Sequence, residues 1–138
     1  MDKKIPTSAK VVVIGGGIAG CSVAYHLAKF GWKDVVLLER DQLTSGTTWH
    51  AAGLLGQIGA SATITKLRNY SLNLYKELEK ETGIATGLKQ NGSLTIATTN
   101  ERLEELKRQA TFAQRFNIEV DSLDKEQIKD IYSLINVD

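Results

Sequence analysis

The sequence predicts an α/β fold that opens with a βαβ dinucleotide-binding unit. Two short aliphatic runs, at residues 10–14 and 34–38, flank a segment with helical spacing over residues 18–30. The turn after the first run places Gly15, Gly17 and Gly20 in the pattern G-x-G-x-x-G. A strand, a glycine-rich turn, a helix and a second strand in this order are typical of a Rossmann-like domain.

Each glycine of this pattern has a separate physical role. Gly15 allows the tight turn out of the strand, and Gly17 leaves room for the backbone to approach a pyrophosphate. Gly20 lets the helix pack closely against the sheet. The first residues of the helix, Ile18 and Ala19, offer N–H groups that have no partner within the helix and that attract an anion. A glycine-rich turn that binds no nucleotide remains the alternative.

An acidic residue ends the second aliphatic run. Glu39 lies 19 residues after Gly20, at the position where a carboxylate can accept hydrogen bonds from ribose hydroxyls. A carboxylate at this position repels a 2′-phosphate, which disfavours NADP. The context of the turn therefore predicts a dinucleotide without that phosphate.

Composition excludes several classes of partner. The chain has 17 Lys and Arg residues against 16 Asp and Glu residues, so no excess charge predicts a nucleic-acid partner. No run approaches the ~18 apolar residues of a membrane span, so we expect no membrane insertion, and we expect no metal site.

The single cysteine, Cys21, suits a reducing compartment. Residues 1–9 lack the Arg- and Ser-rich pattern of a transit peptide, which favours the cytoplasm over the mitochondrial matrix.

The rest of the chain predicts a mixed α+β region over residues 62–138. We expect helices over 62–81, 100–116 and about 124–132, and short strands at 93–98 and 118–120. Residues 40–61 are rich in Gly, Ser, Thr and Ala, and we expect them to be irregular.

Particular residues predict where the helices begin and end. Gly31 and Gly83 follow periodic segments and are expected to end the first two helices. Asn100 is expected to cap the third, and Asp124 with Gln127 has the spacing of a capping box for the fourth.

The segment SGTTWHAAGLL, residues 45–55, follows the predicted ribose-binding acid. Its small residues allow its backbone to run close to a bound dinucleotide. A neutral imidazole is a nucleophile near physiological pH, so His50 could form a covalent bond to the electrophilic 8α-methyl carbon of a flavin. A histidine that only packs or forms a hydrogen bond is the alternative, and Trp49 fits a packing role equally well.

The run VVVIGGGIAGCSVAYHLAKFGWKDVVLLERDQLTSGTTWHAAGLL resembles the N-terminus of the sarcosine and dimethylglycine dehydrogenase family. These are FAD-dependent flavoproteins of the D-amino-acid-oxidase-like superfamily. The resemblance continues through LYKELEKETG, QNGSLTIATT, ERLEELKRQ and the final INVD. TTWHAAGLL is the most specific part, because the covalently flavinylated histidine of the family lies in it.

The resemblance implies that FAD is bound and linked through His50, with contacts from the glycine turn, from Glu39 and Arg40, and from residues 46–54. The cofactor-binding residues that it implies are Gly15, Gly17, Ile18, Ala19, Gly20, Glu39, Arg40, Gly46, Thr47, Thr48, Trp49, His50, Ala51, Ala52, Gly53 and Leu54.

The activity that the resemblance implies is oxidative N-demethylation of a small N-methylated glycine. QNGSLTIA and LLGQ favour sarcosine over dimethylglycine. Electrons would leave to an electron-transfer flavoprotein or another acceptor, and tetrahydrofolate could take the one-carbon unit. Another amine-oxidising flavoprotein of the superfamily and a non-catalytic regulatory relative remain alternatives.

Residues 1–138 are interpreted as an incomplete FAD-binding oxidoreductase domain. Residues 8–61 are the βαβ unit with the flavin-attachment loop, and residues 62–138 begin the remainder. A doubly wound fold needs further parallel strands. The catalytic residues are expected beyond Asp138, so this piece alone is not expected to turn over substrate.

Overall fold

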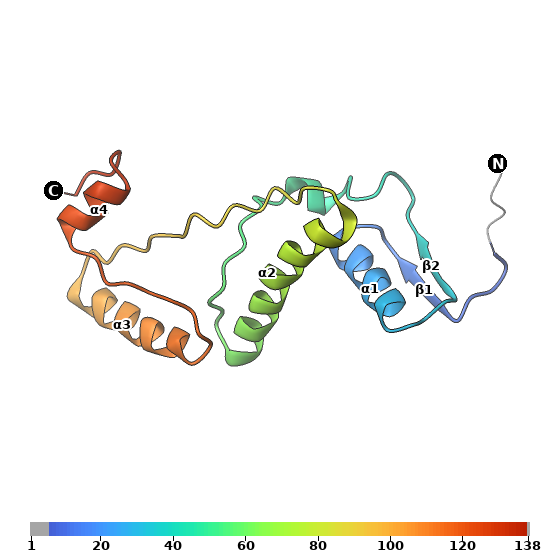
Figure 1. Cartoon of the computed structure of the whole chain (residues 1–138), viewed down its shortest axis with the longest axis horizontal. Helices are drawn as coiled ribbons and strands as arrows, with labels where there is room; N and C mark the ends of the chain where they lie inside the picture. The colour runs from blue at the N-terminus through green and yellow to red at the C-terminus, as the bar shows by residue number, and fades with distance from the viewer. Residues whose placement is uncertain (1–5, 138) are drawn as a thin grey trace. The chain divides into compact units, whose positions relative to one another are not determined.

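The computed structural model describes residues 6–137 (Figure 1). The first five residues of the segment expected over 1–9, together with Asp138, therefore lie outside the described residues. The chain divides into two compact units, Met1–Leu54 and Leu55–Asp138. The first unit contains the predicted dinucleotide-binding elements, and the second contains the three helices expected over residues 62–138.

The first unit confirms the βαβ prediction. Strand β1 (Val11–Ile14) leads into helix α1 (Ile18–Lys29), and strand β2 (Val35–Leu38) follows. The two strands pair in parallel, with Val11 opposite Val35 and Ile14 opposite Leu38. Each element begins and ends within one residue of its expected bounds.

Helix α1 packs against one face of the β1–β2 pair. Val11 and Val13 are half-buried, whereas Val12 and Ile14 on the opposite face are exposed. Alternate burial of this kind is the signature of a strand that is covered on one side. Gly31 adopts φ +88° and follows Phe30, the C-cap residue of α1, which confirms the expected end of the helix.

The second unit contains helix α2 (Ala62–Thr82), helix α3 (Asn100–Gln114) and helix α4 (Lys125–Ile131). Gly83 ends α2 with φ +69°, as expected. The capping box of α4 is also confirmed, because the Gln127 backbone N–H donates to Asp124 Oδ1 and the Asp124 backbone N–H donates to Gln127 Oε1, both at 2.9 Å.

Three local predictions were wrong, namely the residue that caps α3 and the two short strands expected in the second unit. Thr99, and not Asn100, caps α3, since the Thr99 hydroxyl accepts from the Arg102 N–H at 3.2 Å. Both residue types cap helices well, and the sequence does not separate neighbours. The expected irregular region 40–61 contains a 3-10 turn, η1 (Thr47–His50).

The structure does not contain the two short strands that were predicted in the second unit. Neither 93–98 nor 118–120 forms a strand, and the two-stranded β1–β2 pair is the sheet of the described part of the chain. A strand requires a neighbour that accepts and donates its backbone hydrogen bonds. The alternation in SLTIAT favours a strand, but no neighbouring strand pairs with this segment in the described part of the chain. The described residues of 62–138 are helical and irregular.

Few side chains are fully buried. The buried apolar residues are Leu72, Ala113 and Ile118, and Thr65 is the buried polar one. The Thr65 hydroxyl is satisfied, because it donates to the Ser61 carbonyl at 2.9 Å and accepts from the Gly59 N–H at 3.1 Å.

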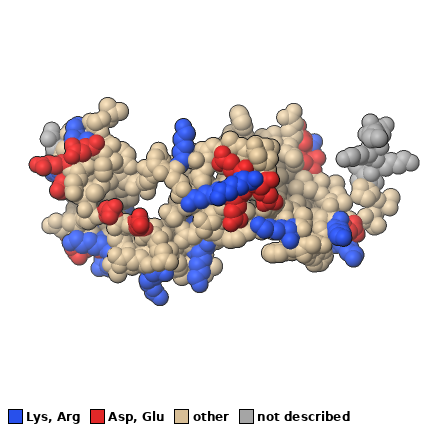
Figure 2. All heavy atoms as spheres, in the orientation of Figure 1, with Lys and Arg blue, Asp and Glu red and all other residues tan. Residues whose placement is uncertain are grey.

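Charged side chains of both signs are interspersed on the surface. Figure 2 shows Lys and Arg alongside Asp and Glu on the face in view. On α3, for example, Arg102 pairs with Glu105 and Lys107 with Glu104. Of the helices described, none is long and apolar enough to cross a membrane.

Candidate functional site

The glycine turn, residues 15–20, joins β1 to α1 and depends on two glycines for its shape. Gly15 has φ +101°, a conformation that side chains rarely adopt, and its N–H extends the ladder to the Leu38 carbonyl at 2.8 Å. A Cβ on Gly20 would lie 1.9 Å from the Gly15 carbonyl oxygen and 3.4 Å from Val13 Cγ1. The missing side chain at Gly20 therefore mainly allows α1 to lie close to the turn, because the contact with strand β1 is much less tight.

Three N–H groups of the turn are available to a ligand. Within residues 6–137, nothing accepts a hydrogen bond from the backbone N–H of Gly17, Ala19 or Gly20. They lie at the first turn of a 12-residue helix, where the helix dipole adds a partial positive charge. Unpaired N–H groups in this position form an anion-binding site that suits a pyrophosphate.

Glu39 is hydrogen-bonded to the glycine turn. Its Oε2 accepts from the Gly16 N–H at 2.6 Å, and its Oε1 accepts from the N–H groups of Arg40 at 2.7 Å and Asp41 at 3.2 Å. The Gly16 N–H, followed by those of Asp41 and Arg40, lowers the pKa of the Glu39 carboxyl below its usual 4.5. Glu39 is thus an anion that supports the turn, and Oε2 retains a lone pair for a further donor.

Sequence reasoning missed Gly16. A Cβ at this position would lie 2.5 Å from Leu43 Cδ2 and 3.1 Å from Glu39 Cβ. The unbroken run of three glycines was the available signal, because the G-x-G-x-x-G pattern leaves its second residue unspecified. Arg40 was predicted as a site residue. It is exposed, and its backbone N–H, as described above, bonds to Glu39.

The segment after Glu39 returns to the glycine turn through two hydrogen bonds. The Thr44 N–H donates to the Gly16 carbonyl at 2.9 Å. The Thr48 hydroxyl accepts from the Ile18 N–H, also at 2.9 Å. A Cβ on Gly17 would lie 3.0 Å from Thr48 Oγ1, so the missing side chain at Gly17 admits this hydroxyl.

The η1 turn fixes the predicted attachment residue. The Gly46 carbonyl accepts from the Trp49 N–H at 3.1 Å and lies 3.0 Å from His50 Nδ1. A carbonyl oxygen can only accept, so the proton of a neutral His50 imidazole lies on Nδ1. The lone pair is then on Nε2, and the His50 side chain is exposed.

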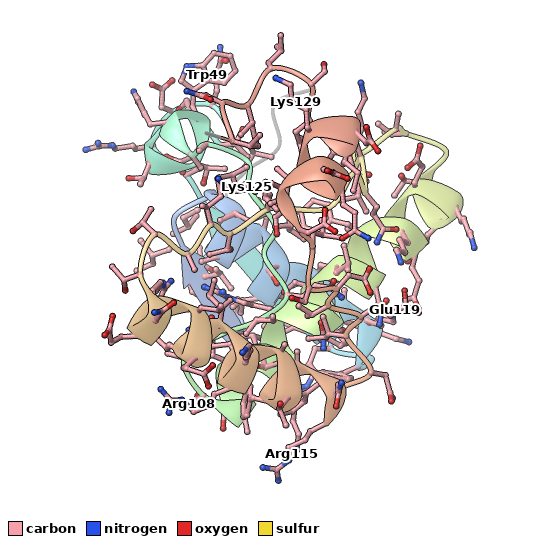
Figure 3. The ribbon with its side chains drawn as sticks, turned by 90° about the vertical axis from the view of Figure 1, so that its left-hand side faces the viewer. Trp49, Arg108, Arg115, Glu119, Lys125 and Lys129 are labelled. Atoms are coloured by element: carbon pink, nitrogen blue, oxygen red, sulfur yellow. The ribbon has the colours of Figure 1, made fainter. Side chains whose placement is uncertain are left out.

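Other residues predicted for the site are less closely tied to the turn. Trp49 is 79% exposed and extends away from the ribbon (Figure 3). Thr47 is also exposed. Among the described residues, no hydrogen bond joins the stretch 51–54 to the glycine turn; it comprises Ala51, Ala52, Gly53 and Leu54, all of them exposed.

No group of three or more metal-ligating side chains occurs in the part of the chain that the structure describes. The groups that the arrangement offers are the unpaired N–H groups at the start of α1 and the exposed imidazole of His50.

Comparison with known families decides the class. A family model described as FAD dependent oxidoreductase matches residues 10–137. The chain belongs to this family. FAD fits the structure, because the unpaired N–H groups of the glycine turn suit its pyrophosphate and Glu39 Oε2 can accept from its ribose.

Individual relatives agree with this family. Human mitochondrial sarcosine dehydrogenase is 47% identical over 99% of this chain. Rat mitochondrial dimethylglycine dehydrogenase is 45% identical over 94% of it. The mouse mitochondrial pyruvate dehydrogenase phosphatase regulatory subunit is 43% identical over 96% of it. This chain spans 15% of the length of each of these three relatives.

A solved structure supports the fold. Glycine oxidase from Geobacillus kaustophilus matches with a TM-score of 0.69 and 31% identity, over 88% of this chain and 35% of that protein. The Rossmann-like, FAD-binding interpretation of the N-terminal sequence is therefore confirmed.

Proposed function

We propose that this chain is the N-terminal, flavin-attaching part of an oxidoreductase that removes a methyl group oxidatively from a small N-methylated glycine. Sarcosine is the first candidate substrate and dimethylglycine the second. The observation that carries the proposal is the position of His50, on a 3-10 turn whose Thr48 is hydrogen-bonded to the start of α1. The names of the human and rat relatives support the substrate class.

The geometry favours His50 as the residue that bonds to the flavin. Because Nδ1 faces the Gly46 carbonyl, Nε2 holds the electron pair that can form a bond to the 8α-carbon of the isoalloxazine. A bound flavin would supply the electrophilic 8α-carbon and the electron acceptor for this bond, and His50 would supply the nucleophilic nitrogen. A covalent link of this kind retains the cofactor and tunes its electronics.

The remaining contacts follow from the same site. We propose that the glycine turn holds the pyrophosphate through the N–H groups of Gly17, Ala19 and Gly20, and that Glu39 accepts from the ribose. Electrons would pass to an electron-transfer flavoprotein, and tetrahydrofolate could accept the one-carbon unit. The relatives are named as mitochondrial proteins, which favours the mitochondrial matrix over the cytoplasm that the first nine residues suggested.

The test replaces each of the two histidines in turn. In the holoprotein, we expect His50→Ala to abolish the flavin that survives acid precipitation, while FAD still binds non-covalently. His26→Ala is the matched control, because His26 lies on α1 and its Nδ1 is 2.7 Å from the Ser22 carbonyl. Covalent flavin in His50→Ala would place the link elsewhere.

A non-catalytic role is the second candidate, because one relative is named as a regulatory subunit. A protein purified from its natural source without any flavin would favour that role. Reduction of bound flavin by sarcosine, with slower reduction by dimethylglycine, would favour the dehydrogenase.

A further inference from the structure

We infer that Thr48 is the positioning residue for His50, through a hydroxyl that joins the η1 turn to the pyrophosphate end of α1. This inference rests on the proposed attachment of flavin at His50 and adds a residue that controls it. Thr48 itself does not contact the bond that forms. Its effect passes through the backbone of one short turn.

The first step is the contact between Thr48 and the helix. Gly17 precedes α1 and offers no side chain to cap it. Thr48, from 30 residues further along the chain, supplies the missing cap, with 2.9 Å between its Oγ1 and the Ile18 nitrogen. Thr48 is half-buried, whereas the other three residues of η1 are exposed, so this side chain is the one that fixes the turn.

The second step connects Thr48 to the imidazole. The Ala51 N–H donates to the Thr48 carbonyl at 3.2 Å, and the Gly46 carbonyl receives the Trp49 N–H. The same Gly46 oxygen holds His50 Nδ1 at 3.0 Å. Because η1 has only four residues, a shift of Thr48 moves the Gly46 carbonyl and with it the imidazole.

The third step concerns the hydroxyl proton. Thr48 Oγ1 accepts one hydrogen bond, and among the described residues nothing accepts its proton. That proton is therefore available to an anionic oxygen beside the unpaired N–H groups of Gly17, Ala19 and Gly20. Through this hydroxyl, binding of the pyrophosphate can affect the position of the turn that carries His50. The coupling is reciprocal, so the position of that turn also affects how tightly the pyrophosphate binds.

The test compares Thr48→Val, which keeps the shape and removes the hydroxyl, with Thr48→Ser, which keeps the hydroxyl. Ser45→Ala is the matched control, because the Ser45 hydroxyl donates to the Gln42 carbonyl and does not reach the glycine turn. Thr48→Ala serves as the second variant if valine prevents folding, which circular dichroism would reveal.

The main readout is the rate at which the full-length apoprotein attaches added FAD covalently. We expect Thr48→Val to lower the rate at saturating FAD about tenfold, the factor that corresponds to one ordinary hydrogen bond. Thr48→Ser and Ser45→Ala should keep the wild-type rate. A rate in Thr48→Val equal to wild type, or a change only in the FAD concentration for half-saturation, would overturn the inference.

A second readout needs no flavin. In the apoprotein, nitrogen NMR should find the His50 proton on Nδ1 in the wild type and in Thr48→Ser, and a mixture of tautomers in Thr48→Val. Identical tautomer populations in all three would also overturn the inference. Failure of the underlying proposal is distinguishable, because the wild type would then carry no covalent flavin, or His50→Ala would keep the covalent flavin of the wild type.

Discussion

Gly20→Ala is the sharpest test of the glycine turn. The added Cβ would lie 1.9 Å from the Gly15 carbonyl oxygen, whereas carbon–oxygen contacts between backbone groups begin near ~3.3 Å. The turn and the helix must therefore separate by roughly 1.4 Å at this point to restore such a contact. The obstacle is backbone, so no side-chain rotation relieves it.

The magnitude follows from two opposing effects. Overpacking of a tight contact costs about 1–3 kcal/mol. Replacing a helical glycine by alanine returns about 0.5–1 kcal/mol, because the unfolded chain has less freedom to lose. We expect the free energy of unfolding to fall by about 1–2 kcal/mol as the net of these effects.

Gly20→Ala should also weaken the binding of FAD. A hydrogen bond to an N–H group requires a separation of ~2.7–3.2 Å, so a shift of this size removes the Gly17, Ala19 and Gly20 donors from the pyrophosphate. We expect FAD affinity to fall at least about tenfold, which corresponds to the loss of one such bond. Urea unfolding and a fluorescence titration with FAD measure the two effects separately.

Gly31→Ala is the matched control for Gly20→Ala. Gly31 has φ +88°, and its added Cβ would meet nothing within 4 Å, so its cost is conformational strain of about 1–2 kcal/mol. It should lose comparable stability and keep FAD affinity. Unchanged FAD affinity in Gly20→Ala, or an equal loss in Gly31→Ala, would refute the assignment of the turn.

Two further predictions concern charge and capping. The Gly16 N–H lowers the pKa of Glu39 below 4.5. The stability that this carboxylate contributes is therefore present above its unfolded-state pKa, and it is lost as pH falls through the folded-state pKa. We expect the free energy of unfolding to decline less below pH 4.5 in Glu39→Gln than in the wild type. Urea unfolding measured across this pH range checks this, and an equal decline in both proteins would contradict it. Thr99→Ala should destabilise the protein by about 1 kcal/mol, because it removes the α3 cap. Asn100→Ala should leave the free energy of unfolding almost unchanged. A larger loss in Asn100→Ala than in Thr99→Ala would show that Asn100 is the cap.

The sequence predicted what depends on local pattern. The bounds of β1, α1 and β2, the ends of α1 and α2 at Gly31 and Gly83, and the capping box of α4 all follow from neighbouring residues. The strand expected at 93–98 failed, because hydrogen-bonding partners come from elsewhere in a chain and alternation alone does not supply them.

The site shows the same division. Gly15 and Gly20 could be identified from spacing. The roles of Gly16 and Thr48 could not, because each depends on a contact with residues more than 20 positions away. Gly17 was predicted to leave room for a pyrophosphate, and in the structure the space beside it admits the Thr48 hydroxyl.

The most direct test of the proposed flavin attachment is peptide mapping of the holoprotein by mass spectrometry after trypsin digestion. The chain has two histidines, and cleavage after Lys and Arg separates them into peptides 11–29 and 41–66. The first peptide also contains Cys21 and Tyr25, whereas His50 is the only histidine of the second. We predict that the flavin mass is found on peptide 41–66, with fragments that place it on His50. Flavin on peptide 11–29, or on neither peptide, would contradict this assignment.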